Sequence, residues 1–281
     1  MNLKEKTKEA VIKASIGCSQ QKITALKKAL KNETNENAIW ALELMLKNIE
    51  IANKKQLPLC DDTGIPHILI EIGENNTLTN KTIEEIKEGI RQGLNQLPGR
   101  PMAVKGNDIE RLEQSKGLYN TPDMVSTAPI LIDTNKNTNT TKVHIMFLGG
   151  GPEIRGKTYR IFHKHSHKTI LNETIEWLKE SLRYLGCTPS IPCIGIGRTH
   201  FEATSLMLKA TAYGNLEKQN KIEKYLTNEL NKTNIGPMGL GGKNTVLGSF
   251  IKIGNQRASG VRIVSVRPSC FVEPRVETIK I

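Results

Sequence analysis

The sequence predicts an α+β protein, with a helical N-terminal part over residues 1–55 followed by a mixed α/β unit. Apolar residues recur at helical spacing from residue 4 to about residue 54, and further helical stretches then alternate with short strand-like runs. Neither an internal repeat nor a low-complexity linker interrupts the 281 residues. We therefore expect a single domain over residues 1–281, large enough to bury a substantial core.

The N-terminal part contains two apolar stripes with the period of a helix. The first includes Val11 and Ala14, and the second runs along residues 39–49. The polar segment KNETNEN separates the stripes and offers Asn32 and Thr34 as caps. The sequence thus predicts helices on both sides of this break.

Beyond residue 55, turn-forming residues delimit shorter elements. Alternating or continuous apolar runs predict strands, and stripes of helical period predict helices. The segment 98–123 has little periodicity and many turn residues. In chain order, the predicted elements are a strand at 67–72, a helix at 82–95, strands at 128–133 and 142–148, a helix at 170–185, a strand at 191–196, helices at 201–213 and 217–231, and strands at 248–253 and 261–266.

Composition argues against a nucleic-acid partner and against a membrane protein. The formal net charge is +12, but the lysines are scattered among asparagines and glutamates, and aromatic residues make up only 4%. Nucleic-acid binders usually concentrate basic charge on one face, often with stacking aromatics. No apolar run approaches the roughly 20 residues that span a bilayer. The N-terminus MNLKEKTKEAVIK lacks the apolar core of a signal peptide, so we expect a cytoplasmic protein.

Five cysteines, an odd number in a chain expected to be intracellular, argue against a disulfide framework. Cys193 lies within an apolar strand and is predicted to be core, and Cys18, at the end of the first helix, is predicted to be structural. Cys60, Cys187 and Cys270 instead lie in turns beside small or polar residues. Their long separations exclude a local metal knuckle, so spacing alone is weak evidence for a metal site.

The segments around these cysteines resemble class I fumarate hydratases and L-tartrate dehydratase α subunits. LPLCDDTG resembles the family's PxCQDTG, and GCTPSIPCIGIGRTHFEAT resembles its CPPxxxGVGIGGT. IGPMGLGGKNTVLG closely matches IGPMGLGGxTTxLG, and SVRPSCFVEPR resembles the terminal cysteine segment of the family. GPEIRG stands where the family has GGGSEN. These matches follow the family's order along nearly the whole chain and imply the iron–sulfur hydro-lyase α-subunit fold.

The resemblance implies that Cys60, Cys187 and Cys270 hold a 4Fe-4S cluster with one iron not ligated by protein. Thiolates are the ligands that such clusters favour. An iron with open positions acts as a Lewis acid on a substrate hydroxyl and carboxylate, which suits a reaction with hydroxide as leaving group. Three protein ligands leave the remaining coordination sites to the substrate.

Asp62 matches the family's aspartate in the Cys-Gln-Asp-Thr-Gly turn. This resemblance implies a role in proton transfer or substrate orientation. The simpler alternative is a turn aspartate that caps the next segment. Asp61 replaces the family's glutamine, where an amide would face a substrate carboxylate, and we expect it to act in catalysis or substrate binding. Gly150 and Gly151 would bring backbone N–H groups toward an anionic substrate, or simply end a strand.

Other positions depart from the family. Arg198 stands where a glycine is usual and would either clamp a carboxylate or remain exposed. Gln256 stands where the family has a histidine near the substrate, so it would bind substrate only by hydrogen bonding. One of the arginines Arg100 and Arg111 is a further candidate for carboxylate binding. The histidines of residues 163–167 invite a zinc interpretation, but a solvated polar stretch is favoured because no carboxylate or cysteine is nearby in sequence.

These observations predict the α subunit of a hydro-lyase that reversibly adds or removes water on a small dicarboxylate, with fumarate and malate first and tartrate next. The resemblance also implies a separate β subunit, in a heterotetramer. The departures at Asp61, Arg198 and Gln256 leave two alternatives open. One is a hydratase for a different hydroxy acid, and the other is a divergent, non-catalytic paralogue that binds an iron–sulfur cluster.

Overall fold

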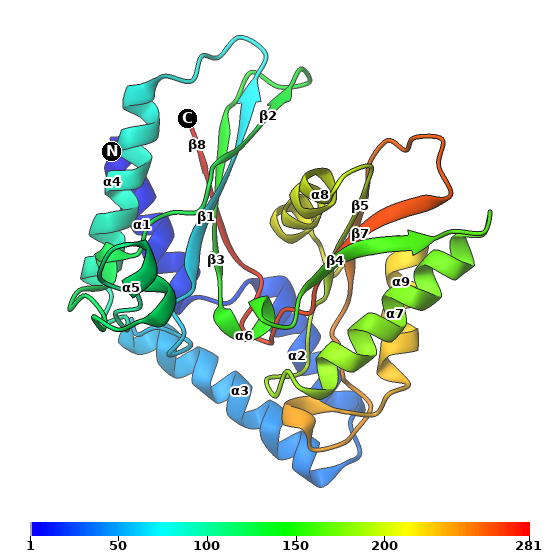
Figure 1. The fold of residues 1–281 in the computed structure, drawn as a ribbon. Helices are drawn as coiled ribbons and strands as arrows, with labels where there is room; N and C mark the ends of the chain where they lie inside the picture. Colours follow the sequence, from blue (N-terminus) through cyan, green and yellow to red (C-terminus); the bar gives the residue numbers. More distant parts are fainter. Residues whose placement is uncertain (1) are drawn as a thin grey trace. The chain divides into compact units, whose positions relative to one another are not determined.

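The computed structural model describes residues 2–281 and comprises two compact units, which together confirm the α+β prediction. Unit 1 contains the chain up to Gly17, Ile49–Gly149 and Arg275–Ile281, and unit 2 contains Cys18–Asn48 and Gly150–Pro274. Each unit has its own four-stranded sheet (Figure 1). The single domain expected over residues 1–281 remains a prediction.

Both sheets contain antiparallel strand pairs and are covered by helices, as expected for an α+β protein. The α-helices are α1 (Leu3–Ile16), α2 (Gln20–Asn32), α3 (Glu36–Lys55), α4 (Asn80–Gln96), α5 (Asp108–Glu113), α6 (Gly150–Glu153), α7 (His167–Arg183), α8 (His200–Tyr213) and α9 (Lys221–Asn231), with 3-10 turns η1 (Pro122–Met124) and η2 (Pro237–Gly239). The strands are β1 (Ile65–Gly73), β2 (Leu131–Asn135), β3 (Lys142–Leu148), β4 (Lys157–Phe162), β5 (Cys193–Gly197), β6 (Phe250–Ile253), β7 (Val261–Arg267) and β8 (Arg275–Lys280).

Unit 1 is a sheet of order β2-β1-β3-β8, with α1 and α4 packed together on one face. Strand β1 is parallel to β2 and antiparallel to β3, and β3 is antiparallel to β8. Alternate residues of β1 and β3, among them Ile68 and Ile145, pack against Val11 of α1 and Ile90 of α4. A Cβ at Gly93 of α4 would lie 2.6 Å from the Val11 side chain, so glycine permits this close helix packing.

Unit 2 is a sheet of order β4-β7-β5-β6, with helices on both faces. Ile194 and Ile196 of β5 face the core formed with α7 and α9, which includes Leu178 and Leu226. Cys193, one residue before Ile194 in the strand alternation, faces Met207 of α8 on the opposite face. Figure 1 shows α7 and α9 on one side of this sheet and α8 on the other.

The N-terminal helices agree with the prediction, but their capping differs from it. The break predicted at KNETNEN separates α2 from α3. Asn32 is the last residue of α2, and the cap of α3 is Asn35, whose Oδ1 accepts hydrogen bonds from the backbone N–H groups of Asn37 and Ala38 at 3.0 and 3.2 Å. The predicted caps, Asn32 and Thr34, were therefore wrong. Asn35 directly precedes α3, so its side chain can reach the free N–H groups of the first helical turn.

Two strands, β4 and β8, have no counterpart in the predicted elements. Both are edge strands, and only Ile161 of β4 and Arg275 of β8 are buried among their residues. An edge strand that is mostly exposed carries polar side chains at most positions, so its sequence lacks the apolar run that marks a central strand.

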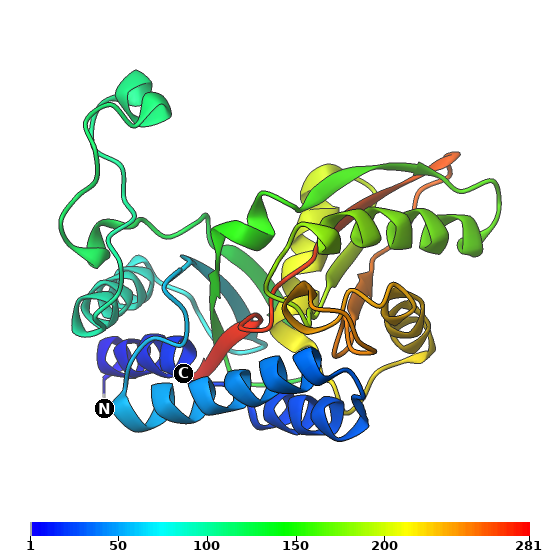
Figure 2. The same cartoon turned by 90° about the horizontal axis from the view of Figure 1, so that it is seen from below.

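The histidine segment between β4 and α7 is not wholly solvated, which corrects the expectation from sequence. His163 is buried: its Nε2 lies 2.7 Å from the Ser259 carbonyl oxygen, and its Nδ1 accepts a hydrogen bond from the N–H of His165. His163 thus fixes the turn at the end of β4. The segment 98–123 contains the short helix α5, which has no buried residue and lies at the tip of a loop extending from unit 1 (Figure 2).

None of the helices within residues 2–281 combines the length and apolar character required to cross a bilayer.

Candidate functional site

In unit 1, the turn from Cys60 to Gly64 leads directly into β1. Cys60 is half-buried, and Asp61 is exposed and accepts a hydrogen bond from Arg100 Nη1 at 2.8 Å. Asp62 is half-buried, and its Oδ1 accepts the backbone N–H of Gly64 at 3.0 Å. The Asp62 side chain therefore stabilises its own turn, as its alternative interpretation predicts, and the second candidate arginine, Arg111, pairs with Asp108 of α5 instead.

Arg275, at the start of β8, holds this turn in place. Its Nη1 donates a 2.8 Å hydrogen bond to the Asp62 carbonyl oxygen, and the side chain is 5% exposed. Gly64 has φ +80°, and a Cβ there would lie 2.6 Å from Arg275 Nη2 and 3.0 Å from the Leu148 backbone. Only glycine fits this turn, because the backbone conformation and the space both exclude a side chain.

In unit 2, the sheet topology brings Cys187 and Cys270 to the same end. Cys187 precedes β5 and Cys270 follows β7, and these two strands are antiparallel. The backbone N–H of Phe271 donates to the Cys187 carbonyl oxygen at 3.0 Å, so the two cysteine segments lie side by side. Cys187 is exposed and Cys270 is half-buried.

Thr188 connects the Cys187 loop to the glycine-rich turn around η2. Its hydroxyl donates to the Gly236 carbonyl oxygen and accepts the N–H of Gly239 at 3.2 Å, while its own carbonyl oxygen accepts the N–H of Met238 at 2.9 Å. Thr188 is fully buried. The conformation of this turn is therefore fixed by the residue that follows Cys187.

The predicted glycines lie at this end of the unit 2 sheet. Gly150 and Gly151 form the first turn of α6, which leads into the end of β4 that pairs with the last residues of β7. Gly150 is exposed, and the space around Gly151 is open, since a Cβ there would contact nothing within 4 Å. Substrate binding by these two glycines remains a prediction.

Arg198 and Gln256 lie at the opposite end of the same sheet. Arg198 follows β5, and Gln256 follows β6, which is parallel to β5. Arg198 is exposed and bonded through Nε and Nη2 to Glu202, and this hydrogen bonding lowers the pKa of Glu202. Gln256 donates to the Gly254 carbonyl oxygen at 2.9 Å. Within unit 2, the structure thus does not gather these two residues with Cys187 and Cys270, and their substrate-binding role remains a prediction.

The remaining cysteines, Cys193 and Cys18, have thiols whose pKa values are raised by burial. Cys193 is fully buried and packs against Met207 and Phe250, as predicted. Burial raises the pKa of its thiol to about 11. Burial also raises the pKa of Cys18, which is half-buried and lies between α1 and α2, so both cysteines remain thiols at neutral pH.

A metal site built within one unit is not present in the described chain. Over residues 2–281, no three His, Cys, Asp or Glu side chains are arranged to hold a metal ion. Cys187 and Cys270 supply two thiols from unit 2, whereas Cys60 belongs to unit 1. These thiols are the donors that an iron–sulfur cluster requires, and none of the three is fully buried, so the residues present fit such a group.

Several buried charged residues that hold the loops around the candidate site were not predicted from the sequence. Arg267 and Glu273 form a buried ion pair on either side of Cys270, and charged residues at the edge of an apolar strand were the available signal. Lys22 and Glu33, which belong to α2 and its C-terminal end, are buried although nothing in their local sequence distinguishes them from neighbouring surface residues.

Glu33 holds the loop that follows the glycine-rich turn. Its Oε2 accepts hydrogen bonds from Lys243 N and Asn244 Nδ2, both at 2.9 Å. Burial raises the pKa of Glu33, but hydrogen bonds from Thr34, Asn244, Asn35 and Lys243 together outweigh it, and the pKa lies below its usual value.

A pH dependence of stability follows from Glu33. Because the folded-state pKa is depressed, its stabilising contribution is present above the unfolded-state pKa of about 4.3 and is lost as the pH falls through the folded-state value. We expect Glu33→Gln to lower the free energy of unfolding by about 1–2 kcal/mol at pH 7, with a smaller deficit near pH 3.5. Urea unfolding at both pH values measures this, with the exposed Glu43→Gln as control. An equal deficit at both pH values would contradict the carboxylate's role.

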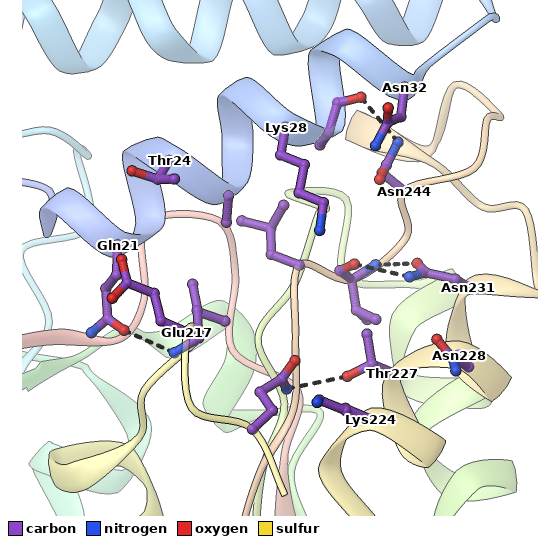
Figure 3. A pocket seen from close by; sticks show the side chains of 16 residues that line it. Gln21, Thr24, Lys28, Asn32, Glu217, Lys224, Thr227, Asn228, Asn231 and Asn244 are labelled. Atoms are coloured by element: carbon purple, nitrogen blue, oxygen red, sulfur yellow. Dashed lines mark hydrogen bonds between the residues drawn. The ribbon is translucent and has the colours of Figure 1, made fainter. Parts of the chain in front are cut away.

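Unit 2 also contains a hollow of about 530 Å³ between α2, α9 and the loops at 216–219 and 244–247 (Figure 3). Its lining is rich in amide side chains, but several of these are bonded to the backbone. Asn231 exchanges two hydrogen bonds with Val246, and Gln219 donates to the Ser249 carbonyl oxygen. None of the candidate site residues lines this hollow. The amide side chains that line it hold the loops against the helices by hydrogen bonds.

Comparison with known proteins identifies the class of this protein. Residues 4–280 match the family model described as fumarate hydratase (Fumerase). The chain is 30% identical, over its full length and 99% of the relative, to a putative L(+)-tartrate dehydratase subunit alpha of Methanocaldococcus jannaschii. It is 22% identical, over 90% of the chain and 82% of the relative, to the L(+)-tartrate dehydratase subunit alpha of Escherichia coli K12.

A further relative is a putative class I fumarate hydratase of Geobacillus stearothermophilus, 23% identical over 89% of this chain. The match covers 49% of that protein's length. The enzymes named in these comparisons are hydro-lyases, and the present chain is an enzyme of this class. It belongs to the fumarate hydratase (Fumerase) family.

Proposed function

We propose that this chain is the iron–sulfur-binding α subunit of a hydro-lyase that reversibly adds or removes water on a small dicarboxylate. Fumarate and malate are the first substrates to test, and tartrate is the next. The observation that carries the proposal is the pairing of the Cys187 and Cys270 segments at one end of the unit 2 sheet, beside the glycine-rich turn. Family membership over residues 4–280 supports it.

Cys60, Cys187 and Cys270 would hold the cluster, with one iron left without a protein ligand. When bound, the cluster supplies a Lewis acid toward the substrate hydroxyl and carboxylate.

Asp62 is the group we assign to proton transfer or substrate orientation. One of its oxygens is held by the Gly64 N–H and its backbone by Arg275, so the carboxylate occupies a fixed position in the turn. General acid–base catalysis requires such fixed placement of the group that exchanges the proton.

Among the differences from the family's sequence pattern, Asp61 in place of glutamine bears most on which substrate is bound. Its carboxylate is paired with Arg100, so the negative charge that replaces the family's amide is balanced by a guanidinium. Both side chains are exposed, and an exposed pair is weak enough to rearrange when a substrate carboxylate competes for the arginine. A different hydroxy acid is therefore the second candidate substrate class.

A separate β subunit, in a heterotetramer, completes the proposal. Two of the relatives are named as alpha subunits, which agrees with an enzyme that contains a second kind of subunit.

Anaerobic purification with the candidate β subunit, followed by iron and sulfide analysis and by assays with fumarate, malate and both tartrates, tests the proposal. We expect the chain alone to bind iron and sulfide with little turnover, and the complex to be active on at least one of the acids. A complex with no iron would refute the proposal. A complex that holds iron but converts none of the acids would favour the non-catalytic paralogue.

A further inference from the structure

The loop from Pro268 to Pro274, which carries Cys270, is held by two buried cations from different elements. Lys22 of α2 is 3% exposed, and its Nζ donates to the carbonyl oxygens of Val272 and Pro274 at 2.7 and 3.0 Å. Burying an ammonium group is costly unless hydrogen bonds replace its water, and these two carbonyl oxygens are such partners. Lys22 therefore fixes the side of the loop that follows Cys270.

Arg267 closes the same loop across Cys270. Its Nε and Nη2 each donate to one oxygen of Glu273 at 2.9 Å, and both residues are at most 2% exposed. Its Nη1 also donates to Glu153 of α6. A two-point guanidinium–carboxylate pair has a defined geometry, so it sets the separation between the two ends of the loop.

The loop is also hydrogen-bonded to residues 187–190, the segment that contains Cys187. Besides the Phe271–Cys187 hydrogen bond, the hydroxyl of Ser190 donates to the Pro268 carbonyl oxygen. Ser269 is buried and has φ +48°, a conformation that a non-glycine residue adopts only when its surroundings impose it. The backbone next to Cys270 is thus set by these contacts and not by local preference.

We propose that Lys22 and Arg267 are positioning residues that hold Cys270 beside Cys187 before any metal binds. The inference rests on the proposed function, in which these two thiols are cluster ligands. It goes beyond that function because it assigns the preorganisation of the Cys187–Cys270 pair to Lys22 on helix α2, more than 200 residues away in sequence. Removing a supporting residue around a metal site typically weakens binding about 10- to 100-fold.

The test uses the full-length apo-protein, reduced and free of iron, titrated with phenylarsine oxide. This reagent binds two neighbouring thiols with release of one water, so it reports their preorganisation without iron or activity. We expect one equivalent to bind wild type and not Cys187→Ser. We expect Lys22→Met to bind about tenfold more weakly, and Lys27→Met, an exposed position on the same helix, to bind like wild type.

Thermal unfolding and circular dichroism establish that each variant is folded at the titration temperature. If Lys22→Met does not fold, Glu273→Gln removes the charge partner of Arg267 without a change of shape, and the same weakening is expected. Affinity equal to wild type in a folded variant, or no binding by wild type, overturns the inference. Iron analysis of the reconstituted wild type decides the proposed function separately, since arsenical binding does not depend on it.

Discussion

Cys270→Ser is expected to abolish iron binding while the fold is retained. Serine is close to cysteine in size, and Cys270 is only half-buried against the unit 2 core, so little packing is lost. The hydroxyl is a far poorer ligand for iron than a thiolate. We expect the iron and sulfide content after anaerobic reconstitution, and the visible absorption of the cluster, to fall at least about tenfold, with loss of hydro-lyase activity in the complex.

Cys193→Ala is the matched control for this experiment. Cys193 is also a cysteine of unit 2, but it is fully buried and its thiol has a pKa of about 11, so it should remain protonated and away from metal. The control should lose some stability from the smaller side chain and keep its iron. Iron content unchanged in Cys270→Ser would remove Cys270 from the ligand set.

Asp62→Asn should lower kcat by about 10²- to 10⁴-fold, the usual contribution of a group that transfers a proton. The asparagine oxygen can still accept the Gly64 N–H, and the backbone bond from Arg275 does not involve the side chain, so the turn should persist. The measurement is the steady-state rate of the anaerobically prepared complex, together with its iron content.

Asp108→Asn provides the comparison, because that aspartate belongs to unit 1 but lies exposed on α5. It should be as active as wild type. If Asp62→Asn retained iron and a kcat within about threefold of wild type, proton transfer by Asp62 would be excluded, and its role would reduce to capping the turn.

The sequence was informative where one physical signal dominates. Central strands such as β3 and β5 are apolar along most of their length, and amphipathic helices such as α4 show a clear period, so both could be predicted. Edge strands β4 and β8 could not, since their side chains are mostly exposed and their pairing depends on partners far away in sequence.

For the candidate site, sequence indicated the cysteines but not what holds them. Resemblance pointed to Cys187 and Cys270, and topology places their segments side by side. The contributions of Lys22 and Glu33 depend on where α2 lies in unit 2, and a lysine or glutamate in an amphipathic helix is ordinarily exposed. No local pattern distinguishes these residues from solvated neighbours.

The pairing of β3 with β8 has a consequence for how the chain folds. Unit 1 draws its sheet from β1, β2, β3 and then from β8, so its fourth strand comes after the whole of residues 150–274. During synthesis, β3 would leave the ribosome with one edge open long before its neighbour exists. Such an edge is a template for pairing with other chains. The half-buried Glu277 and the exposed Lys280 make β8 itself a poor site for further strand addition once it has closed that edge.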